Sequence, residues 1–154
     1  MHIFSISLGE ATNNEAEFSA LEHGLRILRR MENGTTVVEG ESLLAISTAN
    51  KIQNGMKAKK VSKHWRLAMV TCRIAQHLNA LTSVVLHAIQ RQANALADVL
   101  ANHAVDHPTH TIDTCWHEVT CPDLKDDCVR ISRSDLSSMP TEGNNLQSTD
   151  IPSL

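Results

Sequence analysis

The side chains of residues 1–106 switch repeatedly between strand and helix periodicity. Near the start, Phe4, Ile6 and Leu8 share one face and Ser5 and Ser7 the other, which is typical of a half-buried strand. Positions 18, 21, 25 and 28 then carry Phe or Leu at helical spacing. Strands are expected at 2–8, 35–39 and 83–89, and helices at about 14–33, 41–53, 64–78 and 93–104. This alternation predicts an α/β sheet with parallel neighbours.

Composition and charge change abruptly after residue 106. Residues 1–106 carry 11 Lys and Arg against 9 Asp and Glu, whereas residues 107–154 carry 3 against 8 and hold all four prolines. We therefore expect one domain over 1–106 and a low-complexity, largely disordered acidic tail over 107–154. An alternative stays open for residues 107–131, because their scattered apolar side chains also suit a strand or a docking segment.

Several classes of protein are excluded or disfavoured by the composition. No apolar run approaches the roughly 18 residues of a membrane-spanning helix. The apolar residues 1–8 are too short for a secretory signal and lack a cationic flank. Four cysteines without a tight framework indicate reduced thiols, no disulfide partner and an intracellular setting. The spacing of Cys115, Cys121 and Cys128 does not match a zinc pair.

A long cationic block separates the carboxylates of the first 106 residues. No Asp or Glu occurs from residue 42 to residue 97, where eight Lys and Arg lie. Lysine clusters hold phosphate backbones, so we expect the lysines of this block to contact nucleic acid, although they also suit a solvated loop. Trp65 is expected in the core of the following helix. The lysines are Lys57, Lys59, Lys60 and Lys63.

Three carboxylates stand in separate predicted elements, and each has an ordinary structural explanation. Glu17 lies three residues after Asn14 and can complete a capping box. Glu41 can favour the positive end of the helix that begins beside it. Asp98 can be one more solvated helical charge.

The flanking residues make these three positions more informative. The segments TNNEAEFSAL (12–21), VEGESLL (38–44) and RQANALADVLAN (91–102) together resemble, in order and spacing, the motifs of type 1 ribonuclease H domains. The similarity covers about residues 2–106 and is closest to reverse-transcriptase-like domains of plants, oomycetes and retroelements. It implies a ribonuclease H-like mixed sheet flanked by helices, from which this chain lacks the first two strands. Residues 2–8 would then need a rearrangement or a partner strand.

The resemblance also implies a chemistry and a partner. Such domains cleave the RNA strand of an RNA–DNA hybrid with two Mg²⁺ (or Mn²⁺) ions, which several carboxylates hold. Glu17, Glu41 and Asp98 would be both metal ligands and catalytic residues. By the same resemblance Asn13, Asn14 and Asn94 would bind the nucleic acid, Asn13 and Asn14 in the minor groove, where the 2′-OH is read.

Two departures from the family predict impaired catalysis. The first catalytic Asp of the family has no counterpart here, and Glu41 stands where the family has Asp. The extra methylene displaces the carboxylate by about 1.5 Å, which is large beside Mg²⁺–O distances of about 2.0–2.1 Å. His87 lies near the family's mobile His, but we assign it no catalytic role. Two alternatives follow: a nonenzymatic nucleic-acid-binding remnant, or an acidic-tailed interaction protein.

Overall fold

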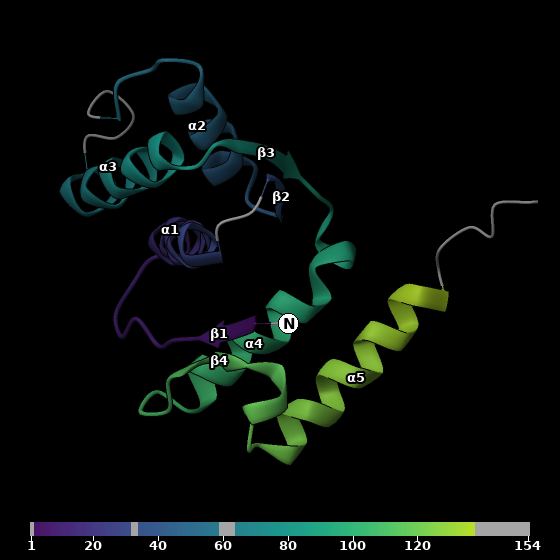
Figure 1. Cartoon of the computed structure of the whole chain (residues 1–154). Helices are drawn as coiled ribbons and strands as arrows, with labels where there is room; N and C mark the ends of the chain where they lie inside the picture. Colours follow the sequence, from purple (N-terminus) through teal and green to yellow (C-terminus); the bar gives the residue numbers. More distant parts are fainter. Residues whose placement is uncertain (1, 32–33, 59–63, 138–154) are drawn as a thin grey trace, which may run out of the picture.

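The computed structural model describes residues 2–31, 34–58 and 64–137 (Figure 1). Strands and helices alternate as the sequence predicts, and the α/β class is confirmed. The elements are β1 (His2–Ser5), α1 (Asn13–Met31), β2 (Thr35–Gly40), α2 (Leu43–Gln53), α3 (Trp65–Ala80), β3 (Ser83–Ala88), the 3₁₀ turn η2 (Arg91–Asn94), α4 (Ala95–Asp106), β4 (Ile112–Cys115), the 3₁₀ turn η3 (Trp116–Glu118) and α5 (Pro122–Ser137). None of these helices is both long and apolar enough to cross a membrane.

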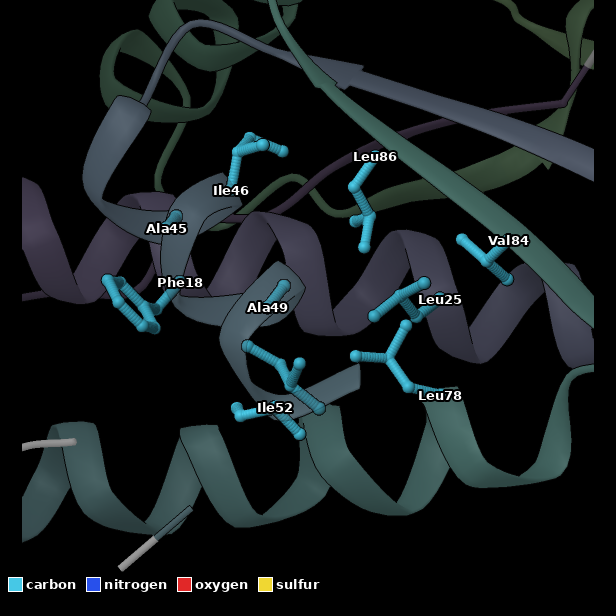
Figure 2. Packing of buried hydrophobic residues seen from close by; sticks show 10 residues of the cluster. Phe18, Leu25, Ala45, Ile46, Ala49, Ile52, Leu78, Val84 and Leu86 are labelled. Carbon is cyan, nitrogen blue, oxygen red and sulfur yellow. The ribbon is translucent and has the colours of Figure 1, made fainter. Parts of the chain in front are cut away.

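The first core lies between the parallel pair β2–β3 and helices α1, α2 and α3. Val37 stands opposite Val85 in this pair, and the alternate residues Val84 and Leu86 are buried. Figure 2 shows side chains from α1, α2, α3 and β3 meeting in one layer. Leu25 at its centre has no exposed surface. Burying such a side chain contributes about 1.5–3 kcal/mol, so this layer is what holds α1 and α2 in place.

The second core lies between the antiparallel pair β1–β4 and helices α4 and α5. The register places Ile3 opposite Thr114 and Ser5 opposite Ile112. Ile3, Ile112 and Leu124 are buried together, with Leu100 of α4 packed against them. In Figure 1 these four elements form one group, apart from β2 and β3.

The described strands form two separate sheets of two strands each, rather than one mixed sheet. By resemblance β1 was expected to need a rearrangement or a partner strand, and β4 supplies that partner. The strand that was left open as an alternative for residues 107–131 is present as β4, whereas the expectation of a largely disordered tail is wrong for α5, which the structure describes as a helix. Residues 138–154 of the expected tail lie outside the described residues. The apolar residues of 107–131 are too few for a core of their own, but they complete one with β1 and α4.

The start of α1 differs from the sequence prediction in a way that concerns the site. The capping box is formed by Thr12 and Glu15: the backbone N–H of Thr12 donates to Oε2 of Glu15 (2.9 Å), and the backbone N–H of Glu15 donates to Oγ1 of Thr12 (3.3 Å). The helix therefore begins earlier than a box of Asn14 and Glu17 would require. Glu17 is left free of any capping role.

Candidate active site

The ends of β2 and β3 place Glu41 and Arg91 beside each other. The backbone N–H of Ile89 donates to the carbonyl of Gly40 over 3.0 Å, which extends the parallel pairing just past both strands. Glu41 follows Gly40 directly, and Arg91 begins η2 two residues after Ile89. Because the carboxyl ends of parallel strands lie at one edge, residues far apart in the sequence meet there.

The three predicted carboxylates interact electrostatically at this edge of the sheet. Glu17 lies in the early turns of α1, Glu41 precedes α2, and Asp98 lies in the first turn of α4. Partial burial raises the pKa of Glu17 above its usual range, and the negative charges of Glu41 and Asp98 raise it further. The fold therefore brings Glu17, Glu41 and Asp98 within each other's electric field.

Arg91 is the charge that balances this cluster. Its Nε donates to Oδ2 of Asp98 over 3.1 Å and lies 3.8 Å from Oε2 of Glu41. These carboxylates raise the pKa of Arg91, and Arg91 in turn lowers that of Glu17. The sequence motif around Asp98 contains Arg91, but its role was not predicted. Arg91 and Asp98 are seven residues apart, with the 3₁₀ turn η2 between them, so the sequence did not indicate that their side chains meet.

The donor chemistry of the cluster suits a divalent cation, but its spacing is not that of a metal cage. Oε2 of Glu41 is buried and has no hydrogen-bond partner among the described residues. A buried carboxylate oxygen without a donor is costly, and a cation would offset that cost. Among the same residues, however, no three His, Cys, Asp or Glu side chains lie close enough together to hold an ion.

Two of the three predicted asparagines flank the site on the surface. Asn13 and Asn14 are exposed in the first turn of α1, on the same helix as Glu17. Asn94 is half-buried at the junction of η2 and α4, one turn before Asp98, and its side chain makes no capping hydrogen bond. The side chains of all three asparagines therefore lie around the carboxylate cluster and are not part of it.

A second exposed surface lies at the start of α3. Trp65 is 64% exposed, which corrects the expectation that it packs in the core. Residues 65, 69 and 73 are all exposed because they lie on one face of α3, whereas Leu67, Val70 and Ile74 pack on the other. The guanidinium of Arg66 stands over the Trp65 ring at 5.5 Å from its centroid.

Glu15 connects this surface to the start of α1. Its Oε2 is used by the capping box, while its Oε1 lies 3.8 Å from both Arg66 Nη1 and His64 Nδ1. The backbone N–H of Thr12 lowers the pKa of Glu15, so this carboxylate is charged at neutral pH. The amino-terminal ends of α1 and α3 therefore lie side by side.

The predicted lysines are only partly within the described residues. Lys57 is exposed and, with Lys51 and Met56, lines an open hollow of about 570 Å³ at the end of α2. Lys59, Lys60 and Lys63 lie outside the described residues. His87 is exposed at the end of β3.

Residues 1–104 match the sequence model of the reverse transcriptase-like family. The chain belongs to that family. Its fold is accordingly ribonuclease H-like, and the family is one of nucleic-acid-related hydrolases. No curated protein and no solved structure matches the chain at a significant level. The family region ends at the last turn of α4 and so contains all three carboxylates, while β4 and α5 lie beyond it.

Proposed function

We propose that this chain is a type 1 ribonuclease H-like domain that binds RNA–DNA hybrid and cleaves it slowly. The observation that carries the proposal is that Glu41 and Asp98, from widely separated segments of the chain, meet at the side chain of Arg91. Partial burial raises the pKa of the neighbouring Glu17, and the charges of Glu41 and Asp98 raise it further. Carboxylates gathered at one site, one of them with a raised pKa, are candidates for a functional site. Their surroundings agree, since Asn13 and Asn14 lie on the same helix as Glu17.

In this proposal Glu17, Glu41 and Asp98 are the residues that would hold Mg²⁺ or Mn²⁺. When bound, such an ion would supply an activated water and stabilise the charge on the leaving oxygen. Glu41 offers the buried oxygen that lacks a donor, and Asp98 becomes available once Arg91 turns away from it. Asn94 then orients Asp98 or meets the substrate.

The hybrid is proposed to lie across the exposed ends of α1 and α3. Asn13 and Asn14 would contact it in the minor groove, and Arg66 would meet a phosphate. Trp65, exposed and flat, offers a stacking surface. Lys57, with the lysines outside the described residues, would extend the cationic path.

One feature makes turnover slow in this proposal. Glu41 stands where an Asp is expected by resemblance, and Mg²⁺ tolerates poor ligand placement badly. The second candidate function, binding without cleavage, is favoured by Arg91, which already neutralises Asp98 without a metal.

The decisive experiment uses labelled RNA–DNA hybrid with Mg²⁺ or Mn²⁺. The wild-type chain is compared with the double variant Glu17→Gln, Asp98→Asn, and with Glu39→Gln as a matched control, because Glu39 is an exposed glutamate of β2 outside the cluster. Cleavage that the double variant loses and Glu39→Gln keeps supports the enzyme. Salt-sensitive binding without cleavage supports the second candidate. A wild-type chain that does not bind hybrid contradicts both.

A further inference from the structure

The helix that carries Asp98 is held largely by residues beyond the family region. Leu96, Val99 and Leu100 of α4 pack against a cluster formed by Ile3 and by side chains that follow residue 106. Those later side chains are Ile112, Val119, Leu124 and Cys128, all buried. One face of α4 is therefore covered by β4, by α5 and by the link between them.

Helix α5 presents a single apolar face to α4. Leu124 and Cys128 are 3% and 1% exposed and lie four residues apart, on one side of the helix. Val129, one position further along, is 38% exposed. Helix α5 is therefore buried along one narrow face, and its contact with α4 depends on few side chains.

Strand β4 is tied to both neighbouring elements. Nε2 of His2 donates to Oδ1 of Asp113 over 2.8 Å, and Nη2 of Arg26 on α1 lies 3.8 Å from the other carboxylate oxygen. The hydrogen bond from His2 lowers the pKa of Asp113. On the other side of β1, Oγ of Ser5 donates to the carbonyl of Leu100 over 2.6 Å. Strand β1 thus links the later segment to α4.

We propose that the segment 112–137 is a positioning element of the carboxylate site, and that Leu124 is its principal positioning residue. Docking of α5 holds α4 so that Asp98 stays beside Glu17 and Glu41. The inference rests on the proposed function only in treating these three carboxylates as one site. It assigns a role to residues that lie outside the family region, and it places the boundary of the functional unit after α5 instead of after α4.

The test compares Leu124→Asp with Val129→Asp in the full chain, using hydrogen exchange and the NMR signal of the Arg91 Nε–H, which donates to Asp98. In Leu124→Asp we expect amide protection in α4 to fall at least about tenfold, while α1 and α3 keep theirs. The signal of the Arg91 Nε–H should shift toward its position in Asp98→Asn, since Asp98 no longer stays nearby. Val129→Asp should match the wild type in both measurements, and Leu124→Met should restore them.

Three results would overturn the inference. These are unchanged protection of α4, an unchanged signal of the Arg91 Nε–H, or equal loss of protection in α1 and α3 in both Leu124→Asp and the milder Leu124→Ala. The third result would make α5 a general support of the fold. Neither measurement uses nucleic acid, so a wild-type chain that fails to bind hybrid counts against the proposed function alone.

Discussion

The Nε atom of Arg91 lies 3.1 Å from Oδ2 of Asp98 and 3.8 Å from Oε2 of Glu41. One cation therefore reaches two carboxylates that come from separate segments of the chain. The Arg91 side chain is 74% exposed, so the arginine can move aside without disturbing the core. Arg91 and a divalent cation would compete for the same negative charge.

Replacing Arg91 by Gln should tighten divalent-cation binding. Removing the competing positive charge leaves the field of Glu17, Glu41 and Asp98 uncompensated. We expect the Mn²⁺ dissociation constant to fall by about tenfold or less, since one such charge contributes about 1 kcal/mol at an exposed site. Isothermal titration calorimetry measures this directly. Arg91→Lys, which keeps the charge, should remain close to the wild type; equal affinities for all three proteins would mean that Arg91 does not compete.

Replacing Glu17 by Gln should stabilise the metal-free chain at neutral pH. The folded pKa of Glu17 is raised above its ordinary 4.5, so folding favours the protonated form. Its stabilising contribution is present below pH 4.5 and is lost as the pH rises through the folded pKa. The wild-type Tm should therefore drop, relative to that of Glu17→Gln, as the pH rises from about 4.5 through the folded pKa.

Thermal unfolding in a chelating buffer, scanned over pH, checks this expectation. At neutral pH the Tm of Glu17→Gln should be higher than that of the wild type. Glu39→Gln, which removes an exposed carboxylate of β2, controls for the general loss of one negative charge. A Tm difference that does not change with pH would contradict the electrostatic origin of the Glu17 shift.

Replacing His77 by Ala should destabilise the packing of α1 against α3. Nε2 of His77 donates to Oε1 of the buried Glu22 over 3.0 Å, while Nη1 of Arg29 donates to Nδ1 over 3.2 Å. Since an arginine only donates, Nδ1 accepts and the ring proton lies on Nε2. Removing the ring leaves a buried carboxylate without this donor, which costs about 1–3 kcal/mol.

Denaturant unfolding measures that loss. Arg73→Ala, on the exposed face of the same helix, should change the free energy of unfolding by no more than about 0.5 kcal/mol. Combining His77→Ala with Glu22→Gln should recover part of the loss, because the buried charge is gone. No recovery would indicate that the cost comes from the lost packing of the ring.

Replacing Trp65 by Ala should weaken hybrid binding without loss of stability. The ring is exposed and contributes little to the core, but stacking of one base on such a ring is worth about 1–3 kcal/mol. Fluorescence anisotropy with labelled hybrid should show a reduced affinity and an unchanged salt dependence. Arg66→Ala, in contrast, should reduce the salt dependence of binding by the amount that corresponds to about one phosphate contact. Met69→Ala, which removes another exposed apolar side chain of α3, should do neither.

Local patterns predicted the elements of residues 1–106 well but misjudged several contacts. The apolar spacing in α1 and α3 reports which face is buried, because each helix turns about 100° per residue. The prediction that Trp65 is buried was wrong because this residue lies at the beginning of α3. Whether a side chain is buried at that point depends on the direction in which the helix enters the fold. The Thr12–Glu15 box was missed because Asn14–Glu17 has the same spacing.

The sequence by itself determined the α/β alternation, the positions of the three candidate carboxylates and the family of the chain. These follow from periodicity and motif, which are local properties of neighbouring residues. Only the tertiary structure decided that Arg91 reaches Asp98 and Glu41, that β4 pairs with β1, and that α5 covers α4. Such contacts depend on how separate segments meet, and their residues taken alone lack the apolar surface to form a core. Residues 112–131 accordingly gain their order from the surfaces of β1 and α4, on which they pack.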